Sequence, residues 1–222
     1  MNTPTLQDRR LAARRRNAGF TLVELLAVMA ILALLVGLSL KIVPMARRSG
    51  QETACSLQLR DIALNLQNWV DQRNEGRWHK EKGIKFLLRP LKEGYLSKDS
   101  VKMFICPGTS DDTRRQEGDE AGSGLLNWDE LDADCISYAG RDNIQYPIRK
   151  DKLGEEIVAS DDNWVAGNGR PNHGDVTLIV FADGRIDKVK TANYVSELPE
   201  KQEWLPVGPE SPDENLKKLV ID

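Results

Sequence analysis

The sequence predicts an α+β protein in which one long N-terminal helix packs on a small antiparallel β-sheet. Three observations support this fold class. Residues 20–40 form a single apolar run that contains only one charged residue. After this run, apolar residues recur at helical spacing as far as Trp69. Residues 175–190 read as two β-strands that are joined by a tight turn.

The composition limits the classes of protein to which the chain can belong. Of its 222 residues, 40% are hydrophobic and 29% are charged, which excludes a wholly disordered polymer and a polytopic membrane protein. The 31 basic residues face 34 acidic residues, so the formal net charge is −3. A protein that binds duplex nucleic acid normally has a basic surplus, and we therefore expect no nucleic acid partner.

The N-terminal part divides into a basic leader, residues 1–19, and a transmembrane helix, residues 20–43. An arginine triplet at residues 14–16 directly precedes the apolar run. A helix that crosses the hydrocarbon core needs about 20 apolar residues, and the run is long enough. Basic residues favour the cytoplasmic side, so the leader is expected in the cytoplasm, although further basic residues follow the run.

The junction between leader and helix carries the motif GFTLVE at residues 19–24. It resembles the prepilin motif of type IV pilins and type II secretion pseudopilins. The resemblance implies that a prepilin peptidase cuts between Gly19 and Phe20 and N-methylates Phe20. It also implies that Glu24 meets the N-terminal amine of a neighbouring subunit during assembly. A carboxylate in a membrane helix is costly, and the alternative is that Glu24 lies near the headgroup layer and reaches water.

A cleavable secretory signal peptide is the other interpretation of the same segment. Its apolar region is normally shorter and is followed by a cleavage site of small residues. Here the apolar run is longer, and residues 40–44 offer no such site. The sequence therefore favours the prepilin interpretation.

The helix is expected to continue beyond the membrane as an amphipathic stalk over residues 44–75. One apolar stripe recurs at spacings of three and four residues, and its members are Cys55, Leu59, Ile62, Leu66 and Trp69. Pro44 should kink or loosen the helix, and the pattern ends near Gly76. We expect the stripe to cover a C-terminal body over residues 76–190, with Cys55 as a small buried apolar residue.

The body is expected to contain short elements between loops. Residues 84–96 read as a short helix and turn that breaks near Pro90, and Gly140 reads as a turn. Short strands or extended segments are expected at residues 101–106, 135–138, 146–148 and 156–159. Residues 191–222 are rich in Pro and Glu and are expected to form a tail that wraps the domain or is partly free.

The clearest element of the body is a β-hairpin over residues 175–190. Residues 176–181 are continuously apolar, which suggests a central strand that is covered on both faces. Asp183-Gly184 is a two-residue signal for a type I′ turn. The return strand is expected at residues 185–189.

His173, nine residues and then Asp183-Gly184 resemble the H-x9-DG signature of a prepilin-associated C-terminal domain. That domain is abundant in Planctomycetes and Verrucomicrobia. Residues 104–107 and 137–138 resemble recurrent pieces of the same proteins. Arg185 departs from the usual pattern, in which His or a similar residue follows Asp-Gly.

His173 is the candidate for catalysis because it is one of only two histidines. No G-x-S-x-G motif accompanies it, and no Ser or Cys has a spacing that implies a nucleophile. We therefore expect a protein that is not an enzyme. We expect His173 to form a hydrogen bond to the hairpin or to a neighbouring strand.

Oxygen ligands for a calcium ion are available in two loops. The calcium candidates are Asp161, Asp162, Asn163 and Asn168, and a second group contains Asp129, Asp132 and Asp134. Neither group matches the EF-hand pattern, and a solvated acidic loop is the simpler interpretation. No cofactor is therefore expected.

The chain has three cysteines. Cys106 and Cys135 flank an acidic loop, and they are the expected disulfide pair if the body lies outside the cytoplasm, where disulfides persist. Cys55 would then remain buried in the stalk. The cysteines are scattered and lack C-x2-C spacing, so the sequence does not predict zinc.

These features predict a structural pilin-like or pseudopilin subunit of a type II secretion or type IV pilus-like filament. The expected partners are other pilin-like subunits, a prepilin peptidase and an inner-membrane assembly platform. The chain is expected to cross the inner membrane once and to hold its body outside the cytoplasm. The alternative is a membrane-anchored extracytoplasmic binding module that does not polymerise, which would need neither Gly19-Phe20 nor Glu24.

Overall fold

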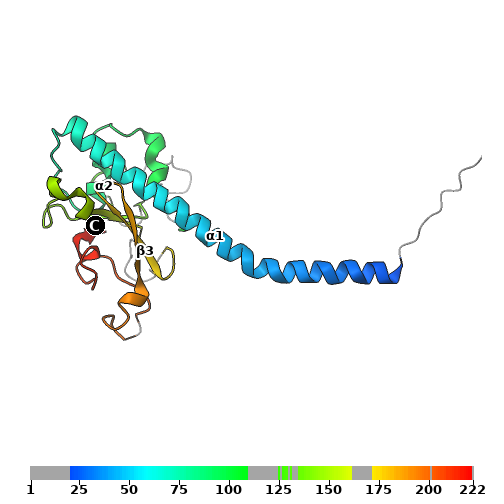
Figure 1. Ribbon diagram of the computed structural model, residues 1–222. Coiled ribbons are helices and arrows are strands. Elements are labelled where there is room, and N and C mark those ends of the chain that lie inside the picture. The colour runs from blue at the N-terminus through cyan, green and yellow to red at the C-terminus, as the bar shows by residue number, and fades with distance from the viewer. Residues whose placement is uncertain are drawn as a thin grey trace, which may run out of the picture. The chain divides into compact units, whose positions relative to one another are not determined.

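The computed structural model describes residues 21–109, 125, 127–129, 131, 135–161, 172–200 and 202–221. The chain divides into two compact units, Met1–Met45 and Ala46–Asp222. Helix α1, Leu22–Arg73, contributes to both units, and Figure 1 shows it in blue to cyan.

The described part of the first unit is the N-terminal half of α1. Its large apolar side chains are exposed from Leu22 to Met45. Within the described residues, α1 is the one helix that is long and apolar enough to cross a membrane. The expected helix is therefore present, and its helical assignment runs through Pro44 without a break.

The second half of α1 packs on the body through the predicted stripe. All five stripe residues are buried in the core. The helix ends at Arg73, and the Gly76 amide donates a hydrogen bond to the Val70 carbonyl oxygen at 2.7 Å. Gly76 has a φ of +69°, a conformation that glycine adopts without strain and that commonly terminates helices. Helix α1 therefore ends close to the predicted end of the apolar pattern near Gly76.

The body contains a five-stranded antiparallel sheet with the strand order β4-β3-β2-β1-β5. The strands are β1 (Ala139–Arg141), β2 (Ile157–Ser160), β3 (Val176–Phe181), β4 (Ile186–Lys190) and β5 (Leu219–Val220). The shorter helices among the described residues are α2 (Gly83–Lys92), η1 (Lys98–Phe104), η4 (Lys150–Glu155), η5 (Thr191–Asn193) and η6 (Leu216–Lys218). The α+β fold class that the sequence predicts is confirmed.

Strand β3, labelled in Figure 1, lies inside the sheet and is covered on both faces. Alternate side chains of a strand point to opposite faces. Leu178 and Val180 join the core that α1 and α2 complete. Ile179 and Phe181 join a second core with buried leucines of the C-terminal segment. The described part of the predicted tail therefore wraps the sheet, and it also supplies β5.

The strand predicted at residues 101–106 is wrong, because the chain forms the 3-10 helix η1 there. Val101 and Phe104 are both buried, and their separation of three residues is the period of a 3-10 helix. The Ser137 amide donates to the Phe104 carbonyl oxygen at 2.9 Å. A short apolar run does not distinguish these two structures by periodicity.

The strand predicted at residues 135–138 is also misplaced. Strand β1 begins at Ala139, and Gly140, predicted as a turn, is paired with both β2 and β5. An ideal Cβ on Gly140 would lie 2.0 Å from the Gly83 carbonyl oxygen. Glycine is required there because α2 begins directly against this strand. Residues 146–148 form no strand.

Helix α2 does not break at Pro90 as the sequence predicts. Proline has no amide hydrogen, so it leaves the carbonyl four residues earlier without its helical partner. That carbonyl belongs to Phe86, and the His79 Nε2–H donates a hydrogen bond to it at 2.9 Å. A side chain from outside the helix thus replaces the missing backbone bond.

The β3–β4 hairpin is confirmed, but its turn differs from the predicted type I′. The loop contains three residues, 182–184. The residues on either side of it are joined by a hydrogen bond, which the Phe181 amide donates to the Arg185 carbonyl oxygen. Gly184 has a φ of +81°, whereas no positive φ occurs at Asp183. This is the pattern of a type I turn that is followed by a left-handed glycine.

Candidate functional site

The described part of the chain begins at Thr21, just after the predicted cleavage point, and Thr21 contacts Glu24. The Thr21 amide and hydroxyl donate to Glu24 Oε2 at 2.8 and 2.9 Å. In return, the Glu24 amide donates to Thr21 Oγ1 at 3.2 Å. This reciprocal arrangement is a capping box, which satisfies orphan amides in the first turn of a helix. Gly19 and Phe20 lie outside the described residues.

A second group of functional side chains lies inside the body. Cys55 from α1, Cys106 after η1 and His173 before β3 are all buried. Their Sγ, Sγ and Nε2 atoms lie within 4.8 Å of one another, and Cys106 Sγ is 3.4 Å from His173 Nε2. These three atoms are potential metal ligands.

Asp161, the residue directly after β2, lies next to the histidine of this group. Its Oδ1 accepts a hydrogen bond from the Leu178 amide at 2.7 Å, and its Oδ2 lies 3.4 Å from His173 Nε2. The structure therefore places the His173 side chain against Cys106, after η1, and Asp161, after β2. These contacts are not with the hairpin turn.

The protonation of the two thiols is coupled because their sulfur atoms are neighbours. The hydrogen bond from Cys55 lowers the pKa of Cys106 well below its ordinary value. Burial opposes this shift, and the hydrogen bond from His173 reinforces it. The same contact with Cys106, together with burial, raises the pKa of Cys55.

The two ends of the H-x9-DG signature do not meet. His173 precedes β3 and Asp183-Gly184 follows it, so the whole six-residue strand, about 20 Å long, lies between them. Asp183 Oδ1 accepts a hydrogen bond from the Arg185 amide at 3.0 Å, within the turn. Arg185 donates to the Gly154 carbonyl oxygen and stacks on Phe181. The signature thus spans one strand, and only its histidine belongs to the buried group.

Residues 14–40 match the prokaryotic N-terminal methylation motif. This motif is of the prepilin type, and it supports a pilin-like N-terminus that is a substrate of a prepilin peptidase. Together with the apolar helix it indicates membrane anchoring. Comparisons with curated proteins and with solved structures found no match. The resemblance of the body to the H-x9-DG domain stays a prediction.

The predicted disulfide between Cys106 and Cys135 is absent. No disulfide joins any of the three cysteines, all of which the structure describes as buried. Cys106 faces Cys55 and His173 instead. Flanking positions around a loop suggested the pair, but the position of α1 determines which thiol Cys106 meets.

The calcium prediction falls largely outside the described residues, because Asp162, Asn163 and Asn168 are not described. Asp161 is described, and its buried carboxylate is directed at β3 and His173. In the second group, Asp132 and Asp134 are likewise outside the described residues. Calcium binding stays a prediction.

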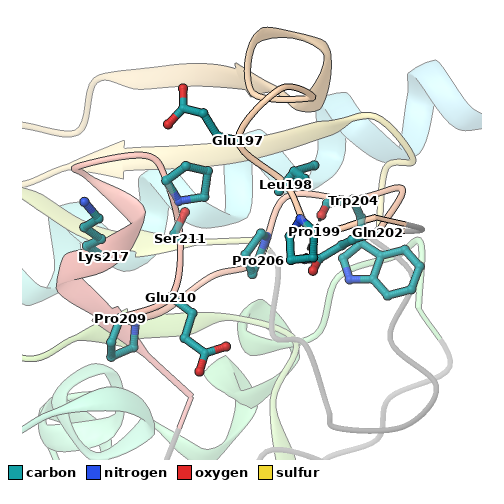
Figure 2. A pocket seen from close by; sticks show the side chains of 11 residues that line it. Glu197, Leu198, Pro199, Gln202, Trp204, Pro206, Pro209, Glu210, Ser211 and Lys217 are labelled. Atoms are coloured by element: carbon teal, nitrogen blue, oxygen red, sulfur yellow. Dashed lines mark hydrogen bonds between the residues drawn. The ribbon is translucent and has the colours of Figure 1, made fainter.

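A pocket of about 430 Å³ lies in the C-terminal segment (Figure 2). Four prolines, Leu198 and Trp204 line it together with polar and charged side chains, among them Glu210 and Lys217. Its buried polar lining residue, Ser211, accepts a hydrogen bond from the Asp213 amide at 3.3 Å.

Sequence reasoning missed a buried ion network beside the sheet. Arg141 donates to Glu156 Oε2 at 2.5 Å, and Arg149 donates to Glu156 Oε1 at 2.6 Å. Burial raises the pKa of Glu156, but the hydrogen bonds from Arg149 and Arg141 hold it below its ordinary value. Arg141 also donates to the carbonyl oxygens of Tyr146 and Ile157. The network ties together β1, β2 and the loop between them.

Proposed function

We propose that the chain is a structural pilin-like subunit of a filament of the type II secretion or type IV pilus kind. Before assembly it is anchored in the inner membrane by α1, with the leader in the cytoplasm and the body outside. Its partners are a prepilin peptidase, other pilin-like subunits and an inner-membrane assembly platform. The observation that carries this proposal is the methylation motif over residues 14–40, placed directly on an apolar helix.

The exposure of the N-terminal half of α1 supports assembly. Its large apolar side chains lack a partner within the described residues of the first unit. Contact with water would therefore be unfavourable for them. Lipid covers them in the membrane. Leaving lipid requires equivalent apolar cover, because exposed apolar surface costs about 25 cal/mol per Å². The helices of neighbouring subunits in a filament core supply this cover.

Membrane anchoring alone would also cover the helix with lipid. An anchor, however, does not require a methylation motif in front of the helix. The motif therefore favours the filament subunit over a binding module that stays in the membrane.

The role proposed for Glu24 is to pair with the N-terminal amine of a neighbouring subunit. A buried pair of opposite charges specifies register more than it adds stability. The capping box gives Glu24 a second, local role at the start of α1. Glutamine also satisfies a capping box, so Glu24→Gln removes the charge and retains the cap.

This difference defines the test of the proposed function. Full-length wild type, Glu24→Gln and Glu24→Val are expressed in a host that has the assembly machinery. Mass spectrometry of the mature chain should find methylated Phe20 in the wild type. We expect sheared filaments from the wild type and few or none from Glu24→Gln, although the cap is preserved.

Glu75→Gln is the matched control, because it removes an exposed carboxylate just beyond α1. It should leave filament recovery unchanged. Normal filaments from Glu24→Gln would rule out the charge pair. A wild-type chain that is processed but absent from every filament would instead favour the membrane-anchored binding module.

A further inference from the structure

The buried group of Cys55, Cys106 and His173 is not explained by the proposed function. The three residues come from separate segments, and two of them lie 67 positions apart in the chain. Each is almost completely inaccessible to solvent. Two thiols and an imidazole that converge at one buried point form a typical ligand set for a thiophilic metal ion.

The spacing of the three atoms fits a single ion. In a tetrahedral zinc site, sulfur and nitrogen ligands are separated from one another by about 3.5–3.8 Å. Cys106 Sγ and His173 Nε2 are 3.4 Å apart, and no pair in the group exceeds 4.8 Å. Small side-chain rotations would therefore place all three atoms around one ion.

Asp161 is the candidate for the fourth ligand, through a carboxylate oxygen that lies next to His173. Its Oδ2 lies 3.4 Å from His173 Nε2. A nitrogen and an oxygen ligand of one tetrahedral zinc ion are separated by about 3.3 Å. The other oxygen, Oδ1, accepts a hydrogen bond from the Leu178 amide in β3. This bond orients the carboxylate, as outer partners of metal ligands commonly do.

A backbone amide also favours a thiolate at Cys106. The Gly108 amide donates to Cys106 Sγ at 3.4 Å. On the other side, the Tyr138 hydroxyl lies 3.5 Å from Cys55 Sγ and donates to Gln58 Oε1. Each sulfur atom thus has one polar neighbour outside the ligand group, the Gly108 amide for Cys106 and the Tyr138 hydroxyl for Cys55.

We propose that Cys55, Cys106 and His173 bind one Zn²⁺ ion, with Asp161 as the fourth ligand. Binding releases the two thiol protons to solvent, His173 coordinates as a neutral imidazole through Nε2 with its proton on Nδ1, and no redox step is involved. The ion joins α1 to the segment after η1 and to the start of β3. Scattered cysteines hid this site in the sequence, because its ligands meet only in the folded body.

The test uses the full-length chain, purified in detergent with a phosphine reductant and stripped of metal by a chelator. Zn²⁺ alone is then titrated against a chromogenic chelator, and bound metal is counted by mass spectrometry. We expect about one Zn²⁺ per chain and a higher melting temperature of the body with zinc than without. Replacement by Co²⁺ should give the intense visible absorption of a tetrahedral thiolate site.

Matched variants assign the ligands. Cys135→Ser removes one buried thiol outside the group and should retain the zinc. Cys106→Ser should abolish stoichiometric binding. In Asp161→Asn, Oδ1 can still accept the Leu178 amide while Oδ2 is lost, and zinc affinity should fall by at least about tenfold.

Two results would overturn the proposal. One is a folded, reduced wild-type chain that takes up no zinc and shows no tetrahedral cobalt spectrum. The other is a Cys55–Cys106 disulfide, mapped by peptide mass in the chain as isolated, whose reduced form also binds no zinc. Both results are measured on the wild-type chain, so the proposal can be tested even if Cys106→Ser does not fold.

Discussion

Gly140 is a single residue on which the packing of α2 against the sheet depends. A Cβ at this position would lie 2.0 Å from Gly83 O and 2.7 Å from Gly83 C, and backbone atoms cannot rotate away. We expect Gly140→Ala to destabilise the body by about 3 kcal/mol or more, because overpacking a tight site displaces the backbone. Chemical denaturation of the detergent-solubilised chain, followed by tryptophan fluorescence, measures this change.

Gly50→Ala is the control for that substitution. Gly50 lies in α1, and a Cβ there would have no neighbour within 4 Å. Alanine is favoured over glycine inside a helix by about 1 kcal/mol. The two glycine-to-alanine substitutions should thus change stability in opposite directions. Equal changes would show that α2 does not pack tightly against β1 at Gly140.

At the scale of an element, α2 depends on a histidine outside it. His79 donates to the carbonyl that Pro90 leaves free, and burial lowers its pKa from 6.5 to about 4. Between these values the unfolded chain binds a proton that the folded chain does not. The body should therefore lose up to about 3 kcal/mol of stability as the pH falls from about 6.5 to about 4.

A His79→Gln variant tests this pH dependence. Glutamine retains a donor for the Phe86 carbonyl oxygen but does not titrate. The difference in unfolding free energy between wild type and variant should shrink or reverse as the pH falls through this window. A constant difference from pH 7 to pH 4.5 would contradict the assigned role of His79.

The elements that sequence reasoning predicted correctly are those with strong local signals. The α1 stripe repeats over four turns, and β3 is a continuous β-rich run that ends at Asp183-Gly184. By contrast, η1 and β1 depend on contacts with distant segments, such as Gly140 against Gly83. The same reason explains the sites. The N-terminal motif is contiguous, whereas Cys55, Cys106 and His173 become neighbours only through the fold.

At the scale of the whole body, the C-terminal segment completes the second core. Leu216 is fully buried there against the face of the sheet opposite α1. We expect Leu216→Ala to cost about 2–5 kcal/mol. Ile144→Ala, a comparable truncation at an exposed site, should change stability by less than about 0.5 kcal/mol. Thermal unfolding followed by circular dichroism measures both changes. Similar losses of stability in the two variants would show that the second core does not stabilise the body.

The position of β5 also determines when the body can finish folding. Strand β1 pairs with β2 on one side and with β5 on the other, and β5 is the last strand in chain order. While the ribosome is still translating the C-terminal segment, the edge of β1 that pairs with β5 has no partner strand. The sheet face that the C-terminal leucines cover is exposed at the same time. An open edge invites pairing with other chains. Nascent chains crowded at a membrane would therefore be vulnerable to aggregation until β5 emerges.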